Sequence, residues 1–412
     1  MNNTGLSSPA GERLHIGFFG RMNSGKSSLI NVFVHQQVSI VSETPGTTTD
    51  AVHKPMEIHG IGAVTLLDTA GIDDSGELGR QRVQASLKAA EECDIAIVLF
   101  AGTESDYSLE SQWVERLLAK GTSVVGVVSK ADLLSQDELQ KKCDSVSSLG
   151  IPAVAVSAIS RVGIVDLRNA LIKAASDLSA PRSITGNLVQ AGDVVILVMP
   201  QDPQAPKGRL IQPEAQTIRS LLEKHCIVVS CALEELDSAI ASLKNPPALI
   251  ITDSQAYRYV YDHLPAGTQL TSFSVLFAAY KGDISYYVES AKAIDALPSD
   301  GHVLIAEICS HVPMQEDIGR VQIPKLLRKR KGDGIKVDVC SGADFPEDLS
   351  SYDLIIQCGG CMFNRAHILS RIARAKNAHV PMTNYGIAIA YMNGILDQVV
   401  YPEEKENEET IR

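Results

Sequence analysis

Two groups of residues in this chain have the side-chain types and the spacing to do chemistry. The first is the segment from Gly20 to Ser28, GRMNSGKSS, which has the pattern of a phosphate-binding loop between an apolar stretch and a helical one. In such a loop the backbone N–H groups surround the phosphates, Lys26 neutralises the β and γ groups, and Ser27 binds magnesium. The segment predicts a nucleotide site formed by Gly20, Asn23, Ser24, Gly25, Lys26, Ser27 and Ser28.

Two further segments supply the magnesium ligands and the phosphate sensor that such a site needs. Asp68 ends the apolar strand AVTLLD, so its carboxylate is expected near the loop, where it reaches magnesium through water. Gly71 is expected to present a backbone amide to the γ-phosphate. The hydroxyl-rich run from Pro45 to Asp50 has the position of a first switch, with Thr48 as the expected magnesium ligand and Thr47 as its close rival. Together with the loop lysine and the serine after it, these residues are expected to catalyse hydrolysis.

The expected base-recognition residues follow two other apolar strands. Asp132 ends the segment SKAD that begins at Ser129, and its carboxylate can accept two hydrogen bonds from N1 and N2 of guanine. Adenine offers no such donors, so a buried carboxylate facing this edge selects GTP. Lys130, Ser157 and Ala158 are expected to complete the base pocket, and the predicted activity is GTP binding and hydrolysis.

The second group consists of cysteines near the C-terminal end. Cys309 and His311 follow one apolar strand, and Cys358 and Cys361 enclose two glycines after a later one. The carboxyl ends of parallel strands meet at one edge of a sheet, so three thiolates can converge there. The gap between Cys358 and Cys361 suits an iron–sulfur cluster or zinc, and spacing alone leaves the two comparable. The remaining cysteines are expected to be core or surface thiols: Cys93, Cys143, Cys226, Cys231 and Cys340.

Apolar strands that alternate with helical patterns must position both groups. In the first part of the chain the strands are LHIGFF, AVTLLD, CDIAIVLF, SVVGVVS and IPAVAVS, which predicts a doubly wound, mostly parallel sheet. A second such pattern begins at Asp193, and a third, from about Leu270, contains HVLIAEIC, a charged linker, IKVDVCS and YDLIIQC. The predicted fold class is α/β, with an N-terminal P-loop G domain followed by two smaller α/β domains with mainly parallel sheets. The expected domains are residues 1–180, 181–268 and 269–412.

The composition limits the possible partners. The net charge of -12 and the pI of about 5.3 give little attraction for nucleic acid or an anionic membrane, so neither is expected as a partner. No apolar run is long enough to cross a bilayer, and the first residues lack the basic and then apolar order of a signal peptide. The expected compartment is the cytoplasm, where cysteines stay reduced.

The nucleotide motifs, in their order along the chain, resemble those of translation-factor-related GTPases of the Era and TrmE type. The resemblance implies that Asn23 helps to hold a potassium ion beside the phosphates, so hydrolysis is expected to be stimulated by potassium. Ile72 stands where Ras-like proteins have the glutamine that orients the attacking water, which predicts slow turnover. The family usually has asparagine where this chain has Ser129, and we expect somewhat looser nucleotide binding because a bracing contact is weakened.

The whole chain also resembles the GTPases that mature diiron hydrogenases, the HydF family. The resemblance rests on the G domain, on C-x-H followed by CGGC, and on the segments EDIGRVQIPKLL and PMTNYGIAIAY. It implies a dimerisation domain and a domain that holds a [4Fe-4S] cluster on Cys309, Cys358 and Cys361, with one iron left exchangeable. It further implies a homodimeric scaffold that receives a transient diiron subcluster from radical-SAM maturases and delivers it to apo FeFe hydrogenase.

The sequence departs from that family at Gln357, where a histidine normally precedes CGGC. The fourth cluster ligand is open between His311 and Glu307, the latter because it lies two residues before Cys309 and points to the same face of the strand. An alternative function is that of other Era and TrmE relatives, a GTPase that acts on RNA or ribosomes, with a structural zinc site in its last domain. The acidic charge and the lack of a recognisable RNA-binding module oppose this alternative.

Overall fold

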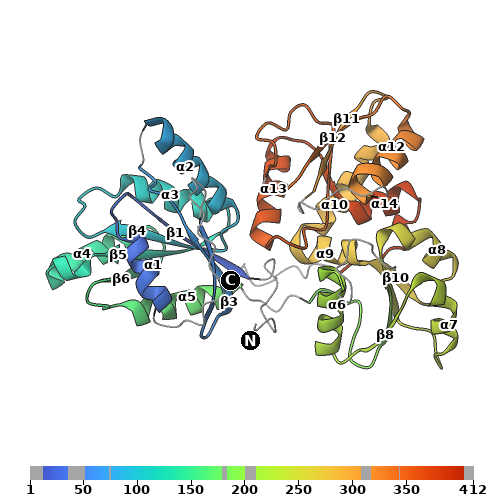
Figure 1. The fold of residues 1–412 in the computed structure, drawn as a ribbon, viewed down its shortest axis with the longest axis horizontal. Helices are drawn as coiled ribbons and strands as arrows, with labels where there is room; N and C mark the ends of the chain where they lie inside the picture. Colours follow the sequence, from blue (N-terminus) through green and yellow to red (C-terminus); the bar gives the residue numbers. More distant parts are fainter. Residues whose placement is uncertain are drawn as a thin grey trace, which may run out of the picture. The chain divides into compact units, whose positions relative to one another are not determined.

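The structure of the chain, a computed structural model, describes residues 13–35, 52–73, 76–178, 183–199, 210–307, 317–342 and 344–402. The chain forms two compact units, one of residues 1–181 with 364–370 and the other of residues 182–363 with 371–412. The first unit contains a six-stranded sheet, and the second contains two four-stranded sheets (Figure 1).

The N-terminal unit is a sheet with helices on both faces. Its elements are β1 (Leu14–Gly20), α1 (Lys26–His35), β2 (Val52–Ile58), β3 (Gly62–Asp68), α2 (Gly76–Glu91), β4 (Ile95–Ala101), α3 (Ser108–Ala119), β5 (Ser123–Ser129), η2 (Ala131–Leu133), α4 (Gln136–Ser147), β6 (Ala153–Ala155) and α5 (Ile164–Leu178). The strand order is β2-β3-β1-β4-β5-β6, and each neighbouring pair is parallel except β2 with β3. Strand β2 is not apparent from the sequence, because it is polar and contains a proline, which is tolerated at a sheet edge.

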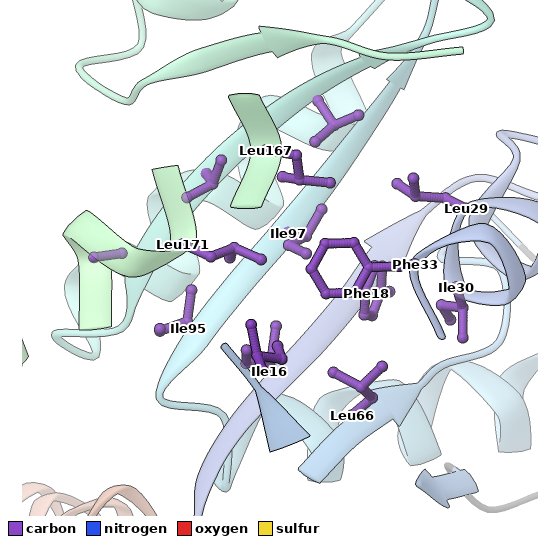
Figure 2. Packing of buried hydrophobic residues seen from close by; sticks show 14 of the residues in the cluster. Ile16, Phe18, Leu29, Ile30, Phe33, Leu66, Ile95, Ile97, Leu167 and Leu171 are labelled. Atoms are coloured by element: carbon purple, nitrogen blue, oxygen red, sulfur yellow. The ribbon is translucent and has the colours of Figure 1, made fainter. Parts of the chain in front are cut away.

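Apolar side chains on both faces explain why this sheet folds. One face packs against α1 and α5, with Phe18, Ile97 and Leu167 in its centre (Figure 2). The other face packs against α2, α3 and α4, and Phe19 and Trp113 belong to that core. Successive residues of a strand point to opposite faces, so the adjacent phenylalanines of β1 enter different cores. The central strands are therefore apolar along their length, as buried parallel strands are.

The second sheet is entirely parallel, in the order β10-β9-β7-β8. Its elements are β7 (Val194–Val198), α6 (Gln212–Glu223), β8 (Ile227–Cys231), η3 (Leu233–Glu235), α7 (Leu236–Ala241), β9 (Leu249–Thr252), η4 (Ser254–Ala256), α8 (Tyr257–Asp262), β10 (Gln269–Ser272) and α9 (Phe273–Lys281). Phe273, Leu276 and Phe277 of α9 share one buried cluster with Leu221 of α6 and with β7 and β9. Helix α9 therefore belongs to the core of the second sheet.

The third sheet is also parallel, in the order β12-β11-β13-β14. Its elements are α10 (Ile284–Ala291), α11 (Ala293–Ala296), β11 (His302–Ala306), η5 (Ile318–Gln322), α12 (Ile323–Lys331), β12 (Lys336–Cys340), β13 (Leu354–Gln357), α13 (Arg365–Asn377), β14 (Met382–Asn384), α14 (Tyr385–Met392) and η6 (Leu396–Gln398). After β11 the chain forms β12 on one side of it. It then crosses to the other side of β11 to form β13, and β14 follows next to β13 at the sheet edge. Right-handed crossovers place α12 and α13 on opposite faces (Figure 1). The strand order thus reverses between β11 and β13, the position where open α/β sheets bind ligands.

These sheets confirm the predicted fold class, an N-terminal P-loop domain followed by further α/β domains with mostly parallel sheets. The expected division between residues 268 and 269 falls just before β10, which pairs with β9 of the second sheet. We propose that the second domain instead ends after α9. The expected charged linker between β11 and β12 contains helix α12. Within the described ranges, no helix is long and apolar enough to cross a bilayer.

Candidate functional site

The phosphate-binding loop connects β1 to α1. Asn23 and Gly25 adopt left-handed backbone conformations, with φ of 57° and 97°, and so bend the chain tightly between strand and helix. The Lys26 ammonium donates to the carbonyls of Gly20 and Arg21 at 2.6 and 2.8 Å. The lysine therefore lies across its own loop, where phosphate oxygens can replace these carbonyls.

Two of the expected magnesium ligands are described: Ser27 lies at the start of α1, and Asp68 lies at the end of β3. Ser27 and Ser28 are exposed in the first turn of α1, where a helix N-terminus favours phosphate. Burial raises the pKa of Asp68, against the opposing charges of Lys54, whose Nζ is 3.9 Å from the carboxylate, and of Lys26. A divalent cation beside this carboxylate would favour its charged form.

The segment after β3 is tied to the phosphate-binding loop. The Ile72 amide donates to the Gly20 carbonyl at 3.2 Å, and the Met22 amide donates to the Asp73 carboxylate at 2.6 Å. A Cβ added to Gly71 would lie 3.0 Å from the Met22 nitrogen, so the backbone approaches the loop closely there. Gly71 is thus placed against the loop, as its expected role as phosphate sensor requires.

The expected base-recognition residues follow β5. The Ser129 hydroxyl donates to the Ser24 carbonyl at 2.6 Å, and both residues are buried. Ser129 therefore contacts the phosphate-binding loop through one hydrogen bond. The looser nucleotide binding expected from the replacement of asparagine stays a prediction. Lys130 adopts a left-handed conformation with φ of 56°, and Asp132 is exposed in η2, where a base can reach it.

The second base-pocket loop follows β6. Ser157 is buried, and its amide donates to the Val162 carbonyl at 3.1 Å, while Ala158 is half-buried beside it. Gly163, with φ of 79°, closes the loop against β6, and a side chain there would overlap the Ala155 carbonyl oxygen. The loops after β5 and β6 thus lie together at the carboxyl edge of the sheet.

Two charge clusters of the N-terminal unit have no sequence motif. Arg21 donates from Nε to Glu110 of α3 at 2.9 Å, and Glu110 is fully buried. Glu92 lies between His15 and His53, whose ring nitrogens are 3.5 and 3.4 Å from its carboxylate. Burial raises the pKa of Glu92, but hydrogen bonds from the two histidines and their charges outweigh it and lower the value to about 2. Both clusters join residues far apart in the sequence, so no local pattern reveals them.

The CGGC motif lies at the carboxyl edge of the third sheet, where the strand order reverses. Ala306, the last residue of β11, is in register with Gln357 of β13 on one side and with Cys340 of β12 on the other. The Cys358 amide donates to the Ala306 carbonyl at 3.0 Å. Cys358 therefore lies beside the end of β11, and Cys340, expected as an ordinary thiol, ends a strand at the same edge.

Glu307, an expected fourth ligand, lies at this edge and forms a salt bridge with Arg320. Its carboxylate accepts from Arg320 at 2.9, 3.1 and 3.3 Å and from the Ser341 hydroxyl at 3.2 Å, and it is almost completely buried. The hydrogen bond to Glu307 raises the pKa of Arg320. Arg320 belongs to the segment EDIGRVQIPKLL, which is thereby connected to the edge. A metal ion bound by Glu307 would have to share the carboxylate with this arginine.

Two buried tyrosines lie beside Cys358. Gln357, which stands where the resembling family has histidine, donates from Nε2 to the Tyr287 hydroxyl at 3.2 Å and so points into the core. The Tyr385 hydroxyl lies against Gly319, where any side chain would overlap it. Burial, and after it the Cys358 thiol, raises the pKa of both tyrosines. Both hydroxyls therefore stay protonated and can act as donors.

The loop from Cys358 to Cys361 is held by Lys281, which the sequence does not reveal. Lys281 ends α9 and is 2% exposed. Its Nζ donates to the carbonyls of Gly360, Cys361 and Phe363 at 3.1, 3.1 and 2.8 Å. The only signal in the sequence is a lysine at the end of the apolar helix FSVLFAAYK, and such a lysine more often extends its ammonium into water.

Several expected ligands lie outside the described residues: Thr47, Thr48, Cys309 and His311. Among the residues that the structure does describe, no group of three or more His, Cys, Asp or Glu side chains is placed to hold a metal ion. The described part of the cysteine group is the CGGC loop with Glu307 beside it.

The chain matches three protein-family models. Residues 184–282 match the Hydrogen maturase F dimerization domain, and residues 285–402 match the Hydrogen maturase F tetramerization domain. Together these two span more than half of the chain. Residues 15–130 match the 50S ribosome-binding GTPase family.

Individual relatives resemble a smaller part of the chain. It is 33% identical over 164 residues to the tRNA modification GTPase MnmE of Pseudothermotoga lettingae, covering 39% of this chain and 35% of that protein. It is 36% identical over 128 residues to GTPase Der of Chloroflexus aurantiacus, covering 30% and 28%. The solved G domain of the T. maritima FeoB iron transporter aligns with a TM-score of 0.30 at 20% identity, covering 40% of this chain and 99% of that one. The chain spans about a third of the length of the curated relatives it matches.

Proposed function

Because the chain belongs to the hydrogen maturase F (HydF) family, we propose that it is a cytoplasmic GTPase that carries a [4Fe-4S] cluster for hydrogenase maturation. In this proposal it receives a diiron subcluster from radical-SAM maturases and delivers it to an apo FeFe hydrogenase. The observation that carries the proposal is the meeting of the CGGC loop with the end of β11, at the strand reversal of the third sheet.

The residues at this edge fit an iron–sulfur cluster. Cys358 and Cys361 supply two thiols from one short loop. Cys309 lies three residues beyond Ala306, so its Cα lies at most about 11 Å from that of Ala306, whose carbonyl binds the Cys358 amide. Three thiolates can therefore reach one cluster, and a cluster with three thiolate ligands leaves one iron for an exchangeable ligand. His311 and Glu307 remain the candidates for that position.

The same proposal gives the N-terminal unit its role in hydrolysis. The ammonium of the loop lysine neutralises the transferring phosphate, while Ser27, Asp68 through water, and Thr48 or its neighbour Thr47 hold magnesium. Asp132 selects guanine by accepting from N1 and N2. Turnover is slow because the Ile72 side chain offers no polar atom to orient the attacking water.

Potassium stimulation is the part of this proposal that is simplest to test. Asn23 is exposed, and its left-handed backbone lies in the loop between β1 and α1, where its amide oxygen can coordinate a cation beside the phosphates. We expect faster GTP hydrolysis in potassium than in sodium at equal ionic strength, and Asn23→Ala should remove the difference. Equal rates in the two salts with the natural chain would rule the potassium site out.

We also propose that the chain assembles with copies of itself through its two C-terminal domains. The descriptions of the family models that match residues 184–282 and 285–402 name dimerization and tetramerization. A homodimer is the smallest assembly of this kind. Analytical ultracentrifugation over a range of protein concentrations would measure it, and a monomer throughout would contradict it.

The experiment that tests the cluster proposal is metal analysis of anaerobically prepared protein. We expect about four irons and matching sulfide per chain, with an EPR signal after reduction. Cys358→Ala should lose this signal, whereas Cys143→Ala, a half-buried thiol in α4 of the N-terminal unit, should keep it. Stoichiometric zinc, with no cluster after reconstitution, would favour the alternative of an RNA- or ribosome-linked GTPase. Salt-dependent RNA binding would then be the next measurement.

A further inference from the structure

We propose that Lys281 is the positioning residue of the cluster loop. Its buried ammonium fixes the CGGC backbone in the conformation that receives the cluster, and its charge stabilises the reduced cluster. The inference rests on the proposed cluster function. It adds to the cluster site a residue from α9, the helix that packs in the core of the second sheet.

The contacts of Lys281 identify it as a charged ammonium. Its Nζ donates to three carbonyl oxygens, those of Gly360, Cys361 and Phe363. A neutral amine has two N–H donors and an ammonium has three, so three acceptors match the charged form. The charge is also favoured by its position in the last turn of α9, at the negative end of the helix dipole, and by the Phe277 ring, whose centroid is 5.6 Å away.

The orientation of the loop carbonyls decides where its amides point. In a planar trans peptide the C=O and N–H groups point in opposite directions. Because two carbonyls of the loop and that of Phe363, just after it, turn toward Lys281, the N–H groups of the same peptide units point away from the lysine. Gly360 has φ of 65°, and successive N–H groups in such a left-handed turn form a concavity that binds anions. Amides that donate to the sulfur atoms of a cluster stabilise its negative charge.

Helix α9 holds the lysine in a fixed place against this loop. Gly359 packs on α9, since a Cβ there would lie 3.9 Å from Phe277 Cβ and from Ser274 Oγ. The Ser274 hydroxyl donates to Asn384 Oδ1 at 3.0 Å and accepts from the Gly386 amide at 3.2 Å. Asn384 and Gly386 belong to PMTNYGIAIAY, so this segment fastens α9 to the domain of the cluster loop. Helix α9, which carries the lysine, is therefore held by contacts with both the second and the third sheet.

The test compares Lys281→Met, which keeps the length and removes the charge and the donors, with Lys292→Met. Lys292 is exposed and pairs with Glu289 at 2.7 Å, so it controls for loss of one lysine. Both variants are reconstituted anaerobically in the full-length chain, and iron, sulfide and the EPR midpoint potential are measured. We expect lower cluster occupancy and a more negative midpoint potential in Lys281→Met only. A tenfold loss in the relative stabilisation of the reduced form corresponds to 59 mV for a one-electron couple.

Circular dichroism of the metal-free variants separates folding from cluster binding. A folded Lys281→Met chain with natural occupancy and potential would overturn the inference. If Lys281→Met does not fold, Lys281→Gln, which keeps two donors without the charge, must still lower the potential, and an unchanged potential would overturn the inference equally. Failure of the natural chain to take up any cluster would instead refute the proposed function, so the two failures are distinguishable.

Discussion

Ser129→Ala removes one hydroxyl that ties the base-recognition loop to the phosphate-binding loop. The bond from Ser129 Oγ to the Ser24 carbonyl is 2.6 Å long and buried. A neutral hydrogen bond of this kind contributes about 1 kcal/mol. Without it, the phosphate-binding loop must be ordered when nucleotide binds, so we expect the Kd for GDP to rise about fivefold. Ser129→Asn, which restores the residue common in Era-type proteins, should bind GDP somewhat more tightly than the natural chain.

The assay is titration with a fluorescent GDP analogue, followed by displacement to obtain the dissociation rate. Ser148→Ala is the matched control, because it removes an exposed hydroxyl that bonds only locally, to the Ser145 carbonyl at 2.6 Å. The expected result is faster dissociation from Ser129→Ala alone. An unchanged Kd combined with a lower melting temperature would show that the bond stabilises the fold without organising the loop, and the reasoning would be refuted.

Three further predictions concern the stability of the N-terminal unit. Gly163→Ala should destabilise it more than Gly150→Ala in urea denaturation. Both residues have φ near 80°, a conformation that is about 1–2 kcal/mol unfavourable for a residue with a side chain. Only at Gly163 does the added carbon also meet a carbonyl oxygen. Equal losses would contradict this. Neighbouring histidines lower the pKa of Glu92 from 4.5 to about 2, so its contribution of about 3 kcal/mol is present above pH 4.5 and is lost as pH falls toward 2. Glu92→Gln should flatten that part of the stability curve, and an unaltered curve would disprove the assignment. Arg21→Met leaves the carboxylate of Glu110 buried without its guanidinium and should lower the unfolding free energy by about 3 kcal/mol. Adding Glu110→Leu should recover most of that loss in the same denaturation, and no recovery would mean that the arginine acts through packing.

The features that the sequence predicts are those encoded in short, contiguous patterns. The phosphate-binding loop is recognisable because its glycines and Lys26 act through the backbone of one turn. The position of Cys358 at the carboxyl edge of the third sheet is predictable because this cysteine follows a strand, and the carboxyl ends of parallel strands share an edge. The sequence also predicts strands β11 and β13, because each contains an uninterrupted apolar run.

The features that the sequence does not predict depend on contacts between distant residues. Lys281 and the CGGC loop, or Arg320 and Glu307, meet only after the sheets are assembled. Helix α12 looks like a charged linker because its last four residues are basic, although Ile323 and Leu327 bury an apolar side beneath them. The hydrogen bond from Ser129 to the Ser24 carbonyl likewise joins segments that lie 105 residues apart in the sequence.

The join between the two hydrogen maturase segments has a consequence for inheritance. One family model ends at residue 282 and the other begins at residue 285, so the lysine and the loop that it contacts fall on opposite sides of a boundary between two domain models. A gene exchange at this boundary would transfer both cysteines of the loop without the ammonium beneath it. If Lys281 positions the loop as we propose, such an exchange keeps the loop in place only when the incoming helix also ends in lysine. The two segments match separate family models, but under the proposal for Lys281 the lysine and the loop depend on each other across that boundary.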